Sequence, residues 1–280
     1  MKLRIITALI LAPLVILGIF ELPLLGFVFA IAGVCFLGLW EWTQFVKGSS
    51  RVVSMAPSLI AIAALLYFVP VDNESLKNVS SSHYGILLVG SLWWIIASAL
   101  VVTYPNSSRL WEGSRLLRHL FGFLTLVPFF FSVILLRAEV VEGDAYHGAK
   151  LVLFVCLLVW AADSGAYFSG KSLGRRKMAP QVSPNKTIEG LIGGVITALA
   201  VAWLAADWFS IEFSSPLTMV IITLATVVIS VLGDLVESMF KRVSGIKDSS
   251  NIIPGHGGVL DRIDSLTAAF PVFAFLYFLF

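Results

Sequence analysis

The chain has 280 residues, of which 58% are hydrophobic and only 13% charged, and its mean hydropathy is +0.94. Soluble globular domains carry about 25% charged residues, so this composition excludes a soluble domain and indicates an integral membrane protein. The net charge of +2 does not indicate nucleic-acid binding, because we expect the basic residues to face an anionic membrane surface. We predict no nucleic-acid partner.

Apolar runs that can cross a bilayer follow one another along the whole chain. A transmembrane helix needs about 20 mostly apolar residues. Runs near this length cover residues 5–20, 22–40, 54–71, 85–103, 119–136, 149–162, 188–209, 217–236 and 260–280. The predicted fold is therefore all-α, a polytopic integral membrane protein with about nine transmembrane helices.

The distribution of Lys and Arg between the predicted loops indicates how these helices are oriented. With the N-terminus in the cytoplasm, only Lys77, Arg137 and Lys150 fall on the outer side. The other sixteen of the nineteen basic residues, among them Lys47 and Arg51, fall on the inner side. Cytoplasmic loops are enriched in basic residues, so this bias supports nine crossings. Loss of one crossing would invert every later loop.

The two cysteines, Cys35 and Cys156, both lie inside apolar runs. Cysteine in such a setting behaves as a small buried hydrophobe. The sequence therefore supports neither a disulfide nor a cysteine metal site.

The character of the loops divides the chain near residue 150. Residues 1–150 contain about five predicted transmembrane helices joined by ordinary polar loops. Residues 151–280 contain the other helices and two segments dense in glycine, proline and charge, 163–187 and 237–262, which we expect to be cytoplasmic loops. We expect the catalytic region in this C-terminal part.

The first of these segments begins with Asp163, directly after an apolar run, and contains five basic residues between Lys171 and Lys186. Basic residues among flexible glycines are typical of a loop that wraps a polyanion. The alternative is a solvated loop in which Thr187 and Glu189 only begin the next helix. We take Asp163 and Lys186 as candidate substrate-binding residues.

A polar stripe marks the cytoplasmic end of the helix predicted at 217–236. At about 100° per residue, Asp234, Ser238 and Lys241 share one side of a helix, and Glu237 lies next to them. Ionisable side chains at membrane depth are costly and usually functional. The helix dipole does not favour an acid near a C-terminus, so Asp234 lacks a simple structural explanation.

A second acidic cluster, of Asp261, Asp264 and Ser265, shares a face at the start of the last helix, directly after Gly257 and Gly258. The run 260–280 spans the bilayer only if both aspartates lie in its first turns. The two acidic clusters are thus expected at the same cytoplasmic interface. For Asp261 alone, a favourable position at a helix N-terminus is the structural alternative.

Carboxylates without cysteine or clustered histidine are typical of Mg²⁺ coordination, which usually involves substrate phosphates as well. Nearby Lys and Arg side chains can bind phosphate oxygens, and backbone N–H groups at a helix start can hold a further anion. The interfacial position indicates that one substrate is a lipid. The pattern therefore predicts phosphoryl or nucleotidyl transfer. A secondary transporter is the alternative from another class, but it would place its ionisable residues near mid-bilayer.

The C-terminal motif resembles the signature of the phosphatidate cytidylyltransferases, the CDP-diacylglycerol synthases. The family pattern is Ser-x-x-Lys-Arg, four residues, Lys-Asp, and then His-Gly-Gly-x-x-Asp-Arg-x-Asp. Here it is filled without a gap by Ser238, Lys241, Arg242, Lys247, Asp248, His256, Gly257, Gly258, Asp261, Arg262 and Asp264. The segment 163–190 is similar to the family's second conserved region.

The resemblance implies the reaction CTP + phosphatidate → CDP-diacylglycerol + pyrophosphate, with one or two Mg²⁺ ions. We expect catalytic roles for Asp234, Ser238, Lys241, Asp261 and Asp264, with the three aspartates holding the metal. The expected substrate-binding residues are Asp163, Lys186, Arg242, Lys247, His256, Gly257, Gly258 and Arg262. For His256, loop packing or helix capping is the alternative.

The resemblance also implies partners and location. CTP and membrane-held phosphatidate are the expected substrates, and the expected location is the inner (cell) membrane of a bacterium, with the active site facing the cytoplasm. The sequence leaves a homodimer open. A cytidylyltransferase acting on an isoprenoid ether lipid is the closest rival. The DG-x-x-A-R pattern of CDP-alcohol phosphotransferases is absent from the sequence.

Overall fold

The structure is a computed structural model that describes residues 2–46, 48 and 50–280, with side chains from residue 9 onward except that of Asn73. Lys47, counted above among the cytoplasmic basic residues, lies outside the described residues. The elements in chain order are α1 (Lys2–Glu21), α2 (Leu24–Val46), α3 (Arg51–Phe68), α4 (Asn73–Lys77), α5 (Ser81–Val102), η1 (Asn106–Leu110), α6 (Arg115–Ala138), α7 (His147–Leu173), β1 (Lys177–Ala179), β2 (Ser183–Thr187), α8 (Ile188–Phe209), α9 (Pro216–Ser244) and α10 (Leu260–Leu279).

The predicted fold class is confirmed, since the described residues consist mostly of long helices and include one short hairpin. Within the described residues, eight helices are long and apolar enough to cross a membrane, namely α2, α3 and α5 to α10. The remaining predicted span corresponds to α1, whose apolar part with described side chains, Leu9–Glu21, is shorter. The protein is a polytopic integral membrane protein. Cys35 and Cys156 are free thiols; Cys156 is buried, as predicted, whereas Cys35 is only half-buried.

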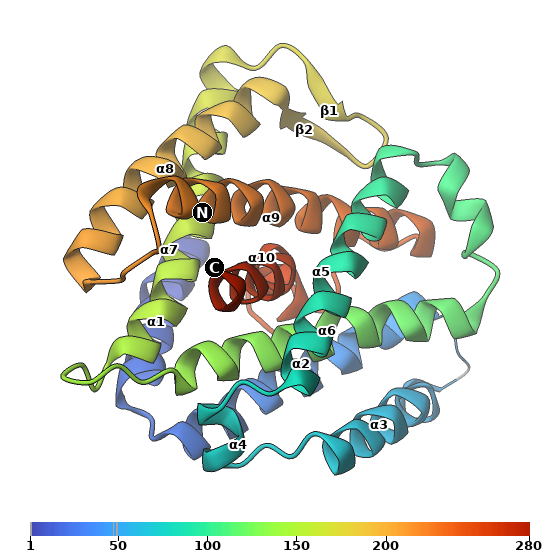
Figure 1. The fold of residues 1–280 in the computed structure, drawn as a ribbon. Coiled ribbons are helices and arrows are strands. Elements are labelled where there is room, and N and C mark those ends of the chain that lie inside the picture. The colour runs from blue at the N-terminus through green and yellow to red at the C-terminus, as the bar shows by residue number, and fades with distance from the viewer. Residues whose placement is uncertain (1, 47, 49) are drawn as a thin grey trace.

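Helix α10 forms the centre of the molecule. In Figure 1 it is seen nearly end-on, with α5, α6, α7 and α9 around it, and it packs against all four. Most of its side chains from Leu260 to Ala274 are buried. Helix α3 lies at the edge of the view, where it packs against α2 and α6. The N-terminal turns of α10, with their aspartates, are therefore held inside the bundle.

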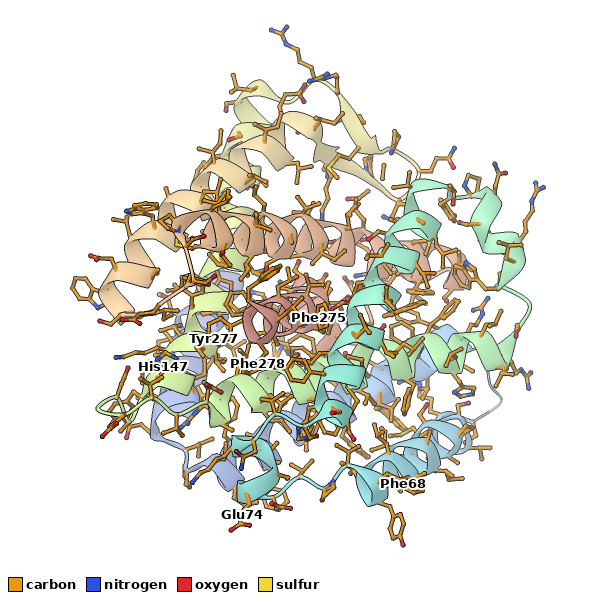
Figure 2. All side chains as sticks on the ribbon, viewed as in Figure 1. Phe68, Glu74, His147, Phe275, Tyr277 and Phe278 are labelled. Carbon is orange, nitrogen blue, oxygen red and sulfur yellow. The ribbon has the colours of Figure 1, made fainter. Side chains whose placement is uncertain are left out.

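Helices α7 and α10 run in opposite directions. Figure 2 labels His147, at the start of α7, close to Tyr277, near the end of α10, and the His147 Nε2 atom is 3.2 Å from the Tyr277 hydroxyl. At 1.5 Å per residue, Asp163 on α7 and Asp264 on α10 are each about 20 Å or more along their helices from this contact. The acidic ends of the two helices therefore meet at the opposite side of the molecule.

The two segments predicted as loops are shorter than expected, and the bounds 163–187 and 237–262 were wrong. Residues 163–173 continue α7, and 177–187 contain an antiparallel hairpin that pairs Lys177 with Thr187 and Ala179 with Ser183. Residues 237–244 continue α9, which ends at Gly245 in a left-handed conformation with a φ of 72°. Only residues 245–259 between α9 and α10 lack regular structure.

Close packing between α7 and α8 explains why the glycine-rich end of α7 stays helical. Glycines from both helices line their contact. A Cβ atom added at Gly194 would lie 2.7 Å from the Ala162 carbonyl oxygen and 3.3 Å from the Ala166 Cβ. Small residues let helix backbones approach closely in membranes, and this packing offsets the low helix propensity of glycine.

Replacing Gly194 with Leu should therefore destabilise the protein, because the larger side chain must push α7 and α8 apart. Overpacking of this kind costs about 1–3 kcal/mol. Gly33→Leu on α2 is the matched control, because no atom lies within 4 Å of a Cβ added there. We expect thermal unfolding in detergent to show a lower midpoint for Gly194→Leu alone. Equal midpoints would mean that the α7–α8 contact tolerates a side chain.

Candidate active site

A polar cavity of about 330 Å³ lies where α7, α9 and α10 meet. It is lined by Asp163, Asp234, Lys241, Asp248, Asp261, Arg262, Asp264 and Ser265. Seven of these eight residues are charged, so the cavity is suited to charged ligands rather than to an acyl chain. The structure thus brings both predicted acidic clusters together with Asp163, which lies about seventy residues earlier in the chain than Asp234.

The Asp234 carboxylate is held by groups from two elements. Its Oδ2 atom lies 2.6 Å from the Lys186 Nζ atom, which the hairpin strand β2 brings to α9. Lys186 also donates to the Val231 carbonyl at 3.3 Å. The Ser238 hydroxyl, one turn along α9, donates to Asp234 Oδ1 at 3.3 Å. The helical stripe predicted from spacing is therefore real, and Lys186 joins it from the segment before α8.

Lys241 lies between two carboxylates. Its Nζ atom is 2.8 Å from Asp261 Oδ1 and 3.1 Å from Glu237 Oε1. The side chains of Asp261 and Glu237 are only 4% and 5% exposed, and that of Lys241 is 13% exposed. This buried ammonium group is the main positive charge that balances the two acids.

Asp261 organises the loop before its own helix. Its Oδ2 atom accepts hydrogen bonds from the Ser249 amide at 2.8 Å and the Gly258 amide at 2.7 Å, and the Ser249 hydroxyl lies 2.9 Å away. Gly257 has a φ of 84°, and a Cβ there would lie 2.6 Å from the same oxygen. Both facts require glycine at position 257. With Lys241 on Oδ1, four donors surround a group that has about four acceptor sites.

Of the predicted substrate-binding residues Arg242, Lys247, His256 and Arg262, only Arg262 lines the cavity. Arg262 is exposed and lines the cavity, whereas Lys247 is exposed and is not part of its lining. Arg242 donates through Nε to the Val182 carbonyl at 3.2 Å, so it holds the hairpin against α9. His256 is half-buried, and its Nδ1 atom has no hydrogen-bond partner among the described residues.

The donor set of the cavity fits a hard divalent cation by its chemistry. Five of the eight lining residues are aspartates and two are basic, and no histidine or cysteine is among them. Mg²⁺ takes such oxygen ligands together with substrate phosphates. As the described side chains stand, no group of three His, Cys, Asp or Glu residues is arranged to hold a metal. The metal roles of Asp234, Asp261 and Asp264 therefore remain a prediction.

Asp261 and Asp264 differ in the number of hydrogen-bond donors around them, and this difference affects how readily each could bind a metal ion. Asp264 accepts one described hydrogen bond, from the Ser265 amide at 2.8 Å, whereas Asp261 is surrounded by four donors. Asp264 thus has more free acceptor capacity than Asp261. Asp261 would have to release Lys241 or a loop donor to bind a cation.

Two residues of this site were not among the sequence-based candidates. Asp248 lines the cavity, and the buried Ser249 holds Asp261. Asp248 belongs to the signature pattern itself, so the motif could have identified it. Ser249 follows directly after it and carries no signal of its own in the sequence.

Comparisons with known proteins show the family of the chain. The cytidylyltransferase family matches residues 2–280. A phosphatidate cytidylyltransferase of Haemophilus influenzae is 45% identical over 284 residues, which cover 99% of each chain. A protein of the same name from Pseudomonas aeruginosa is 42% identical, and the match covers 99% of this chain and 96% of the relative. Another from Bacillus subtilis is 35% identical, and the match covers 100% of this chain and 97% of the relative. The resemblance of the C-terminal motif is thereby confirmed, and the chain belongs to the cytidylyltransferase family.

Proposed function

We propose that this protein transfers the cytidylyl group of CTP to phosphatidate, giving CDP-diacylglycerol and pyrophosphate for phospholipid synthesis. The observation that carries the proposal is the convergence of the signature residues on one charged cavity at the ends of membrane helices. The full-length similarity to proteins named phosphatidate cytidylyltransferase supports it.

The reaction is a substitution at phosphorus. A phosphate oxygen of phosphatidate attacks the α-phosphorus of CTP, and the bond from that phosphorus to the oxygen shared with the β-phosphorus breaks. Pyrophosphate leaves with the bonding electrons, and nothing is oxidised or reduced. A phosphate monoester has its second pKa near 6, so the nucleophile is largely a dianion at neutral pH and needs no strong general base.

Repulsion between this dianion and the triphosphate is the main obstacle, and the basic residues of the site can relieve it. Arg262 is exposed in the cavity and can form paired hydrogen bonds with phosphate oxygens. Lys241 and Lys186 are held by Asp261 and Asp234 at the cavity wall. Preorganised charges of this kind stabilise negative charge that develops in the transition state.

Mg²⁺ would add further charge neutralisation by binding phosphate oxygens, with Asp234, Asp264 and Asp261 as its protein ligands. Ser238 would then orient Asp234, to which it already donates. The loop of His256, Gly257 and Gly258 shapes the site through Asp261.

The expected location is the inner membrane of a bacterium, with the cavity open to the cytoplasm, where CTP is found. The bias of basic residues toward the segments on this side supports that orientation. No nucleic acid takes part. The proposal holds for a monomer or a homodimer, because one chain supplies every residue of the cavity.

Detergent-purified protein should convert labelled CTP into a lipid-soluble product when phosphatidate and Mg²⁺ are present. Excess EDTA should abolish the product, and added Mg²⁺ should restore it, because the carboxylate-rich cavity needs a cation to accept a triphosphate. Thin-layer chromatography against CDP-diacylglycerol measures the product. An isoprenoid ether phosphate tested in parallel separates the rival substrate class. Folded protein that makes no lipid product with either substrate would refute the proposed function.

A further inference from the structure

Glu41, in the N-terminal half of the chain, is completely buried, and its carboxylate contacts residues 249–260, the loop that leads from α9 into α10. It lies on α2 and has 0% exposure. Its carboxylate lies within hydrogen-bond distance of four donors: Ser249 Oγ at 3.0 Å, Ser250 Oγ at 2.5 Å, Val259 N at 2.9 Å and Leu260 N at 2.7 Å. All four donors belong to the short segment between α9 and the start of α10.

Two of these donors are the backbone amides at the start of α10. The first amides of a helix have no partner within the helix and are usually satisfied by a polar side chain just before it. Here the N-cap residue is Val259, which forms no side-chain cap. Glu41 supplies this cap from a different helix, and its negative charge is favourable at a helix N-terminus.

One of the other two donors, the Ser249 hydroxyl, connects Glu41 to Asp261. The buried Ser249 hydroxyl lies 3.0 Å from Glu41 Oε2 and 2.9 Å from Asp261 Oδ2, so one side chain bridges the two acids. Gln44, one turn further along α2, donates to the Ser249 carbonyl. A Cβ atom at Gly258 would lie 2.6 Å from both Glu41 oxygens, so the loop fits directly against this carboxylate.

We propose that Glu41 is a positioning residue for the transfer reaction. Glu41 does not line the cavity. It fixes residues 249–260, which hold Asp261 through the Ser249 and Gly258 amides. The same residues lead into the helix that carries Arg262 and Asp264. The proposal rests on the proposed function for its link to catalysis. The anchoring of the loop can be tested without substrate.

The kinetic test compares Glu41→Gln, Glu41→Asp and the control Glu142→Gln, which changes an exposed residue of the loop before α7. Glutamine keeps the size of the side chain but offers one acceptor oxygen and turns an NH₂ group toward donors. A charge-assisted hydrogen bond is lost and a buried donor is left without an acceptor, so we expect kcat per folded molecule to fall by about tenfold or more in Glu41→Gln. Glu41→Asp, which keeps the charge, should recover part of the rate, and Glu142→Gln should match the wild type.

The substrate-free test is hydrogen–deuterium exchange of peptides that cover residues 249–262. Glu41→Gln should raise their exchange about tenfold or more over the wild type while peptides from α5 and α7 stay unchanged, because the Val259 and Leu260 amides bond different oxygens of Glu41 and one of them would face the NH₂ group instead of an acceptor. If Glu41→Gln does not fold, Ser250→Ala, which removes one donor, should raise exchange in the same peptides and lower kcat by a smaller factor.

The outcomes separate the two proposals. If the wild-type protein shows no cytidylyl transfer, the proposed function is refuted. Hydrogen–deuterium exchange would still test whether Glu41 anchors residues 249–260. Active wild type with unchanged kcat and unchanged exchange in the folded variants would overturn the positioning role. A lowered melting temperature with normal kcat and normal exchange at 249–262 would mean that Glu41 is structural only.

Discussion

Asp261→Asn should lower kcat by at least about 100-fold, the largest loss that we expect from any isosteric change in this site. The carboxylate is surrounded by four donors from Lys241, Ser249 and Gly258. Asparagine has one acceptor oxygen, and its NH₂ group must face either the Lys241 ammonium or the loop amides. Facing Lys241, the NH₂ group removes the bond to the ammonium; facing the loop, it leaves the Ser249 and Gly258 amides without an acceptor, and in both cases the remaining hydrogen bonds lose their charge. Hydrogen bonds to charged groups are worth about 1.5–3 kcal/mol each, and each 1.36 kcal/mol corresponds to a tenfold change in rate.

The measurement is the initial rate of CDP-diacylglycerol formation at saturating CTP, normalised to folded protein. Asp207→Asn, an exposed position in the last turn of α8, is the matched control and should keep the wild-type rate. Near-normal turnover by Asp261→Asn would show that Asp261 is not needed for catalysis. The loop 249–260 would then not act in catalysis by holding Asp261.

The features of the fold that depend on one helix alone could be predicted from the sequence. The length of each apolar run must match the bilayer, so helices such as α8, predicted at 188–209, were located within a few residues. The side of a helix that carries a polar stripe follows from 3.6 residues per turn, so Asp234 and Lys241 were correctly placed on one face. These are local properties of the chain.

The features that could not be predicted depend on contacts between distant segments. Residues 163–173 read as a loop because glycine and serine are poor helix formers, and only the close approach of α8 stabilises them as helix. Glu41 reads as an ordinary polar residue near the end of a membrane helix. Its partners follow more than 200 residues later, and nothing in the local pattern indicates them.

Lys241→Met should cause the largest loss of stability and should also abolish activity. Lys241 is the cation between Glu237 and Asp261, whose side chains are almost completely buried. Removing one partner of a buried ion pair costs about 3–5 kcal/mol, because the remaining charge is left without compensation. Here two carboxylates would be left facing each other. Thermal unfolding in detergent, followed by intrinsic tryptophan fluorescence, should show a strongly lowered midpoint.

Lys150→Met is the matched control, because the Lys150–Asp144 pair has the same 2.8 Å separation as Lys241 and Asp261 but lies in a more exposed place, with side chains 26% and 23% exposed. Solvent-exposed pairs contribute about 0–1 kcal/mol. This half-buried pair is more accessible to water than the Lys241 pair, so the midpoint should fall much less than in Lys241→Met. Equal losses in the two variants would mean that burial does not govern the strength of these pairs.

The double variant Glu237→Gln with Lys241→Met then separates stability from catalysis. Neutralising Glu237 removes one of the two uncompensated buried charges, so part of the lost stability should return. Activity should not return, because Asp261 would still lack the ammonium group that holds its Oδ1 atom at the cavity wall. Recovery of both properties would show that Lys241 serves the fold alone and that the charge balance in the cavity is supplied by other residues.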